Sequence, residues 1–279
     1  MNKLSIVRAF SLLICGVVLA GCAGSQIQQG SKEEGLKLAR LLRDQGRLEA
    51  STEVYARLDS RGNLAGKELI EYGSVASAVK SPQETLGIYS RARQQLSGDT
   101  QKMEKNESLA LCLGMARAQI ALGRTQLAQR DLDCALKLDP QNAIALNGAG
   151  VVLDASGKHP EARIQFDKAL QSDPSNTSAL NNMALSWLNS AEPAKAIELL
   201  RTTDSSTPGA QLNLALAYLY QGDTEAAHDT LSAIASPDRV EGLMNTLSQR
   251  ADELKQPQSR GSSLLLASRS PLQLSDIKQ

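Results

Sequence analysis

The side chains of this 279-residue sequence that could attack a substrate or bind a metal ion are few. A thiolate is a good nucleophile, and thiolate and imidazole are the usual ligands of zinc. Neither histidine, however, has a second histidine or cysteine at the spacing of a metal site, and the sequence has no glycine-rich phosphate loop. We therefore predict no catalytic residue, no metal, no small-molecule substrate and no enzymatic activity. The candidate side chains are those of Cys15, Cys22, Cys112, Cys134, His159 and His228.

Cys22 follows a segment with the features of a bacterial export signal. Two basic side chains near the N-terminus precede an apolar run, residues 10–20, that is too short to span a bilayer. The run ends in four residues that resemble a bacterial lipobox, namely Leu19, Ala20, Gly21 and Cys22. The resemblance implies that a signal peptidase recognises the first three, and that Cys22 takes a diacylglycerol and an acyl chain. An ordinary secretory signal with a chance cysteine is the alternative.

The residues after Cys22 bear on location. Ala23 follows the cysteine, whereas an aspartate there would imply retention in the inner membrane. The lipobox resemblance therefore implies a lipoprotein anchored by its acyl chains at the periplasmic face of the outer membrane. Residues 1–21 are then removed as the signal peptide. Residues 22–31, rich in glycine, serine and glutamine, form a flexible lipidated tether.

One pattern occurs twice within residues 123–174, at an offset of 34 residues. A glycine turn is followed by small, large and small residues at i, i+4 and i+7 of one helical face, and then by a proline that stops the helix. A repeat of this length is typical of stacked helical units. The pattern resembles the tetratricopeptide repeat, which implies an all-α, right-handed superhelical solenoid of about six helix–turn–helix repeats. The matched residues are Gly123, Ala128, Leu132, Ala135 and Pro140, followed by Gly157, Ala162, Phe166, Ala169 and Pro174.

The same spacing divides the rest of the chain. Two divergent repeats come first, and in them Tyr55 and Tyr89 again lie 34 residues apart. A polar interruption then breaks the period, which predicts a lengthened loop or helix where two subsets of repeats could hinge. Four more repeats follow, then one capping helix over the apolar end of the stack and a disordered tail, or a tail that docks on a partner or the groove. The predicted boundaries are 32–99, 100–108, 109–241, 242–255 and 256–279.

The first helices of such repeats, by the family resemblance, line a concave groove that holds a peptide segment of a protein partner. Asparagine side chains there can both donate to and accept from a peptide backbone, and leucine and valine can take apolar side chains. The alternative is that the apolar positions are core, and Asn182 and Asn213 match a common structural asparagine of the repeat. A carboxylate clamp would need basic side chains, and only Arg117 qualifies. The implied groove residues are Leu113, Arg117, Asn147, Val151, Asp154, Asn181, Leu185, Leu188, Asn189, Leu216 and Tyr220.

Cys112 and Cys134 fall on the two helices of the third predicted repeat. The helices of a repeat are antiparallel, so both residues lie near one end of the hairpin and could form a disulfide in an oxidising compartment. Cys134 also directly precedes the packing residue Ala135, which would turn its side chain away. Two free, partly buried thiols are therefore the alternative.

The lipobox and the repeats together resemble the lipoproteins of bacterial pilus and secretion machines, in particular those of tight-adherence (Flp) pilus assembly. Residues 181–187, 193–201 and 211–223 carry this likeness. It implies a scaffold that binds proteins, among them a secretin and pilus assembly proteins, and that aids secretin localisation or assembly. A type IVa pilotin, another envelope-assembly scaffold, and a regulator of a cell-wall hydrolase or synthase are the alternatives. Nucleic acid is excluded as a partner because Lys+Arg and Asp+Glu are 30 each, with no basic excess.

Overall fold

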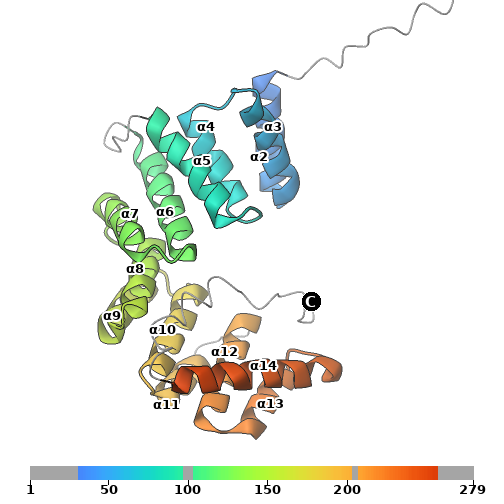
Figure 1. Cartoon of the computed structure of the whole chain (residues 1–279), viewed down its shortest axis with the longest axis vertical. Coiled ribbons are helices and arrows are strands. Elements are labelled where there is room, and N and C mark those ends of the chain that lie inside the picture. Colours follow the sequence, from blue (N-terminus) through green and yellow to red (C-terminus); the bar gives the residue numbers. More distant parts are fainter. Residues whose placement is uncertain (1–30, 97–102, 203–206, 257–279) are drawn as a thin grey trace, which may run out of the picture. The chain divides into compact units, whose positions relative to one another are not determined.

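The computed structural model describes residues 31–96, 103–202 and 207–256, in which helices are joined by turns and loops (Figure 1). Within them the chain forms thirteen α-helices and no strand. The predicted all-α fold is therefore confirmed. The predicted signal peptide, nearly all of the tether with Cys22 and the lipobox, and all but the first residue of the tail lie outside the described residues.

The first twelve described helices pack as six consecutive pairs, and α14 follows the last pair. The described helices are, in chain order, α2 (Lys32–Asp44), α3 (Leu48–Ser60), α4 (Gly66–Ala76), α5 (Pro82–Gln95), α6 (Lys105–Ala121), α7 (Thr125–Leu138), α8 (Ala143–Ala155), α9 (His159–Ser172), α10 (Thr177–Asn189), α11 (Pro193–Thr202), α12 (Pro208–Gln221), α13 (Thr224–Ser232) and α14 (Pro237–Lys255).

The first of two compact units, residues 1–63, contains α2 and α3 in its described part. Ser31 caps α2, because its Oγ accepts from the backbone N–H of Glu34 at 3.2 Å. The Glu34 carboxylate in turn accepts from the backbone N–H of Ser31 at 2.8 Å, which completes a capping box. Leu58 of α3 lies so close to Gly35 of α2 that a Cβ on the glycine would be 2.8 Å from Leu58 Cδ2. The two helices thus form one hairpin with its own small core.

The second unit, residues 64–279, is in its described part a stack of five hairpins followed by one more helix. The hairpins are α4/α5, α6/α7, α8/α9, α10/α11 and α12/α13, and the second helix of each packs on the first helix of the next. The last described helix, α14, packs on both α12 and α13 and buries Val240 and Leu247. It begins at Pro237, ahead of the start at residue 242 expected from the sequence, because proline suits the first turn of a helix.

Small residues on the first helices allow large side chains of the second helices to approach closely. A Cβ added to Gly150 in α8 would lie 2.4 Å from Cε1 of Phe166 in α9. A Cβ added to Gly148 would lie 2.7 Å from Leu132 Cδ2 of the preceding hairpin. The periodic positions found in the sequence therefore mark the packing between helices. All are at most 2% exposed, namely Ala128, Leu132, Ala135, Ala162, Phe166 and Ala169.

Part of the predicted polar interruption is helical. The predicted interruption covered residues 100–108, but α6 begins at Lys105 and has 17 residues, compared with 13 in α8. The extra residues therefore add a turn to α6 as well as lengthening the connection from α5. Helices α5 and α6 pack directly together, and the boundary between the two compact units lies between Asn63 and Leu64.

The turns inside the described hairpins, apart from that of α4/α5, contain a residue with a left-handed backbone. Gly123, Gly157 and Gly222 have φ values of +69°, +76° and +93°. The fifth predicted repeat has Ala191 at this place, 34 residues after Gly157, and its φ is +60°. An L residue other than glycine is strained there.

Candidate partner-binding groove

The first helices of the second unit form a continuous series. Helices α4, α6, α8, α10 and α12 each contact the next one along, and α12 contacts α14 (Figure 1). Side chains on one side of these helices therefore belong to a single face that extends through several repeats. The family resemblance placed the groove on this face.

Two asparagine pairs connect the repeats along this face. Asn182 Nδ2 of α10 donates to Asn147 Oδ1 of α8 at 2.9 Å, and Asn213 Nδ2 of α12 donates to Asn181 Oδ1 of α10 at 3.0 Å. All four side chains are half-buried. Since an amide has two N–H groups and two lone pairs, one such bond leaves each side chain with further hydrogen-bonding capacity.

The predicted groove residues fall into two groups by exposure. Arg117 is exposed, and four others are half-buried, namely Leu113, Asn147, Asn181 and Tyr220. The remaining six are at most 8% exposed, namely Val151, Asp154, Leu185, Leu188, Asn189 and Leu216. The structure places these six in the packing between helices instead of on the groove surface, because the neighbouring helices cover them.

Asp154 shows what such a buried position does. Its side chain is 1% exposed, accepts a hydrogen bond from Asn189 Nδ2 at 2.6 Å, and lies 2.9 Å from His159 Nδ1. A buried carboxylate is costly unless it is hydrogen-bonded, so these partners are what permit its burial. The three side chains come from α8, α9 and α10, and they hold these helices together.

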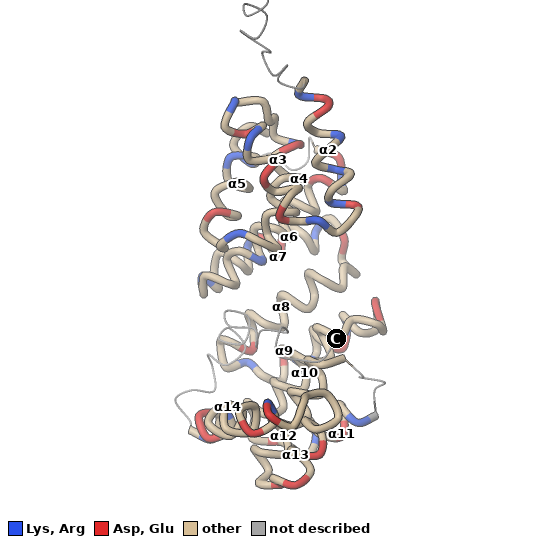
Figure 2. The backbone as a smooth tube through the Cα atoms, turned by 90° about the vertical axis from the view of Figure 1, so that its right-hand side faces the viewer, with Lys and Arg blue, Asp and Glu red and all other residues tan. Residues whose placement is uncertain are grey.

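The first helices of the last three hairpins are almost uncharged. Asp154 is the single charged residue in α8, α10 and α12 together, and it is buried. Figure 2 shows the uncharged run of α8. Helix α6 differs, because it carries Lys105, Glu107 and Arg117. The exposed polar groups of α8, α10 and α12 are therefore amides and hydroxyls, and these three helices themselves offer no cation for a carboxylate. A neighbouring helix does bring one close, because Lys255 Nζ of α14 is 5.8 Å from the ring centroid of Tyr220.

The single tryptophan of the chain lies beside two cations. The ring centroid of Trp187 in α10 is 3.7 Å from Arg163 Cζ of α9 and 4.4 Å from Lys195 Nζ of α11. Arg163 Nη1 also donates to Ser190 Oγ at 2.8 Å. Burial lowers the pKa of Arg163, and the carboxylate of Glu192 opposes this shift. Sequence reasoning missed this cluster, because the three side chains come from different helices and no spacing rule connects them.

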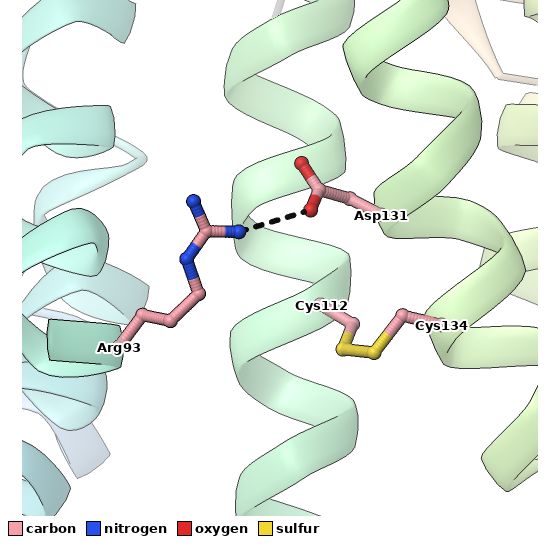
Figure 3. The surroundings of a disulfide bond; sticks show 4 residues. All are labelled: Arg93, Cys112, Asp131 and Cys134. Carbon is pink, nitrogen blue, oxygen red and sulfur yellow. Dashed lines mark ion pairs between the residues drawn. A yellow bond between two sulfur atoms is a disulfide. The ribbon is translucent and has the colours of Figure 1, made fainter. Parts of the chain in front are cut away.

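Cys112 and Cys134 are joined by a disulfide between α6 and α7 (Figure 3). Their Cα atoms are 6.0 Å apart, a usual separation for a disulfide. Cys134 therefore turns toward Cys112 even though it precedes the packing residue Ala135. Nearby, Arg93 Nη1 of α5 is 3.6 Å from Asp131 Oδ1 of α7, and burial raises the pKa of Asp131 against the effect of this arginine.

One hollow lies beside α11 and the end of α12, lined by Ala194, Ile197, Glu198, Arg201 and Gln221. The described residues contain no group of three histidine, cysteine, aspartate or glutamate side chains placed to hold a metal ion. Of the helices in this part of the chain, none combines the length and apolarity that a bilayer crossing requires.

Comparison with known proteins supports the repeat assignment. Residues 113–177, from α6 to the start of α10, match the family model of the tetratricopeptide repeat. A comparison with curated proteins gave no match.

Several solved structures are similar in fold. A tetratricopeptide repeat protein from Parabacteroides merdae ATCC 43184 has a TM-score of 0.57 and 18% identity over 86% of this chain and 99% of its own. A chain of the APC/C hetero-tetramer Cut9–Hcn1 has a TM-score of 0.61 and 15% identity, over 79% of this chain and 43% of its own. A thermophilic tetratricopeptide-repeat protein from Thermus thermophilus, TTC0263, has a TM-score of 0.50 and 19% identity, over 72% of this chain and 100% of its own.

At these identities the structural similarity establishes the fold alone. The family model, in addition, identifies tetratricopeptide-repeat sequence in two consecutive hairpins. Residues 113–177 therefore have tetratricopeptide-repeat sequence, and the described helices share the fold of solved tetratricopeptide-repeat structures.

Proposed function

We propose that this chain is a non-catalytic scaffold, anchored to a membrane through Cys22, that binds a protein partner along the first helices of its repeats. The observation that carries the proposal is the uncharged face of α8, α10 and α12 with its paired asparagines. The unused donors and acceptors of these amides suit the backbone of an extended segment. The half-buried Leu113 and Tyr220 on the same series of helices suit its apolar side chains.

The charge distribution limits the kinds of partner segment that can bind. Because the exposed side chains of α8, α10 and α12 carry no charge, ion pairs with these helices contribute nothing to binding. The part of the bound segment that lies over α8, α10 and α12 is therefore expected to be uncharged, whereas a part that reaches α6 would meet the exposed Arg117. Since screening by salt acts on charges, binding to α8, α10 and α12 is expected to change little between low and high ionic strength.

The disulfide and the lipobox support one compartment. Disulfides persist in oxidising surroundings such as the bacterial periplasm and are rare in the cytosol. Cys112 and Cys134 are joined in this way, and the sequence around Cys22 resembles a lipobox. The proposal therefore places the repeats in the periplasm, with the lipid in the outer membrane.

The resemblance to the tight-adherence pilus lipoprotein TadD suggests a setting for such a scaffold. In this setting the protein helps a secretin ring to localise or assemble, while the lipid holds the repeats beside the membrane in which the ring inserts. Pilus assembly proteins are then further partners. This part of the proposal rests on the sequence likeness of residues 181–187, 193–201 and 211–223.

Site-specific photo-crosslinking in intact envelopes tests the groove. A photoreactive residue at Asn147 or Asn181 is expected to crosslink to the partner, whereas one at Lys168 on α9, exposed on a second helix, is the matched control. Equal capture from Lys168 would refute the groove. Identification of a secretin among the crosslinked proteins would support the pilus setting. Identification of a cell-wall enzyme instead would contradict the pilus setting but agree with the scaffold function.

Fractionation tests the anchor separately. Cys22→Ser removes the proposed lipid-bearing thiol and leaves the described helices unchanged, so the variant is expected to fold and to leave the membrane fraction. If the variant stays with membranes after a high-salt wash, the proposed anchor is refuted.

A further inference from the structure

Two large apolar side chains of α2, the first helix among the described residues, face solvent. Leu38 and Leu41 of α2 are 48% and 54% exposed. They lie three residues apart, so they share one side of the helix. The other leucines of α2, Leu36 and Leu42, are buried against α3. We call the side that carries Leu38 and Leu41 the free face of α2.

The corresponding positions are covered in later repeats, wholly in α6, α8 and α12 and partly in α10, where Met183 is half-buried and Ser186 is buried. Leu38 and Leu41 lie eight and five residues before the turn glycine Gly46, and the residues at these places in α6, α8 and α12 are at most 7% exposed. Those of α8 belong to one core cluster with Leu132 of the preceding hairpin. The position is therefore one that a preceding hairpin covers, and among the described residues no helix precedes α2. The buried equivalents are Met115, Ala118, Ala149, Val152, Leu214 and Ala217.

The chain around the free face indicates what covers it. The segment from Cys22 to Ser31 can span at most about 30 Å, so a lipid on Cys22 keeps α2 close to the bilayer. Helix α2 is also weakly basic, with four basic and three acidic side chains. Long basic side chains can lie along a lipid surface while neighbouring leucines enter it. The charged residues are Lys32, Lys37, Arg40, Arg43, Glu33, Glu34 and Asp44.

We infer that the free face of α2 rests on the lipid bilayer, with Leu38 and Leu41 inserted at the level of the headgroups. This inference rests on the proposed anchor at Cys22. A separate protein partner needs about 800 Å² of surface on each side, which two leucines do not provide. A tether instead makes the contact intramolecular, so a small apolar patch is sufficient. The contact orients the first hairpin against the membrane.

Fluorescence quenching by brominated lipids tests this contact without relying on natural lipidation. The mature chain, residues 22–279, has Cys22 as its one free thiol once Cys112 and Cys134 are joined, so Cys22 can be coupled to a maleimide phospholipid in vesicles. In a Trp187→Phe background, Leu38→Trp places the single tryptophan on the free face. Glu53→Trp on α3, whose glutamate side chain is 73% exposed, is the matched control.

Brominated phosphatidylcholine with phosphatidylglycerol is expected to quench Leu38→Trp about twofold or more, because its indole reaches the acyl boundary, and Glu53→Trp much less. Adding Leu41→Ser is expected to weaken docking about fivefold, from the apolar surface lost. Equal quenching of Leu38→Trp and Glu53→Trp would overturn the inference. So would an unquenched Leu38→Trp whose emission shifts to the blue with protein density, which would point to a second copy as the occupant. Matching circular dichroism melts verify that each variant folds.

Discussion

Ala191→Gly is expected to stabilise the protein, although replacing alanine by glycine usually destabilises a helical protein. Ala191 has a φ of +60° and ends the turn between α10 and α11. Its N–H donates to Leu188 O at 2.9 Å, and the N–H of Glu192 donates to Trp187 O at 2.9 Å. The same two bonds occur around Gly157, in the equivalent turn one repeat earlier. The alanine therefore adopts a backbone conformation that four other described hairpins give to glycine.

The size of the effect follows from two opposing terms. A left-handed conformation costs a residue other than glycine about 1–2 kcal/mol. Glycine also makes the unfolded chain more flexible, which lowers stability by about 0.5–1 kcal/mol. Ala191 is exposed, so its methyl group contributes little packing. The net gain expected for Ala191→Gly is about 0.5–1 kcal/mol.

Two glycine-to-alanine substitutions serve as controls for the sign of the change in stability. Gly157→Ala places a methyl group at a φ of +76° with no atom within 4 Å, so the expected loss of about 0.5–1 kcal/mol is purely conformational. Gly87→Ala in the interior of α5 also meets no atom within 4 Å, but the backbone there is helical. It is expected to gain about 1 kcal/mol.

Urea unfolding followed by circular dichroism measures all three. If backbone conformation alone determines the change in stability, the urea midpoint of unfolding rises for Ala191→Gly and Gly87→Ala and falls for Gly157→Ala. The slope m stays unchanged. A lower midpoint for Ala191→Gly would refute the reasoning, because it would mean that the alanine side chain contributes more than its backbone conformation costs.

Three more predictions concern the packing between helices. The double substitution Cys112→Ser and Cys134→Ser should lower the free energy of unfolding by about 3 kcal/mol, because the disulfide closes a loop with a sequence separation of 22 residues. Urea unfolding measures this loss. As a control, adding reductant to the unsubstituted protein should lower the free energy of unfolding by the same amount. Gly150→Ala should cost about 1–3 kcal/mol in the same assay, because the new Cβ would overlap Phe166, whereas Gly242→Ala, which meets no atom within 4 Å, should not destabilise. Burial raises the pKa of Tyr89 to about 12, so its neutral phenol stabilises the fold below pH 10, and this contribution is lost as pH rises through 12; phenolate absorbance against pH checks it.

The sequence was sufficient to predict the hairpins where side-chain size alone sets the packing. Ala128, Leu132 and Ala135 recur one repeat later, and the structure buries both sets. A helix that must accommodate Phe166 needs a residue as small as Gly150 opposite it, so this periodicity carries three-dimensional information. The glycine turns could be read in the same way, except at Ala191, where the residue type conceals the turn.

The groove was less predictable, because a periodic pattern tells which side of a helix a residue occupies but not how deeply it is covered. Leu188 and Leu216 occupy groove-facing positions by the family pattern. The adjacent helices nevertheless bury both side chains, which are at most 1% exposed. Asp154 is buried as well, and only the positions of Asn189 and His159 explain how a carboxylate can be there. Depth depends on contacts between repeats, which no single repeat encodes.

The asparagine pairs connect stability with binding. Each pair joins two successive first helices, so Asn147 and Asn181 are already fixed in orientation before a partner arrives. A side chain that is held in place loses less entropy when it binds, and so a preorganised amide gives more affinity per hydrogen bond than a free one. The same bonds also set the spacing between repeats, and therefore the spacing of the amides along the face. A partner whose backbone groups match that spacing can use both pairs at once, whereas a poorly matched segment can use only one. On the proposed function, discrimination between partners thus follows from the distance between repeats rather than from charge.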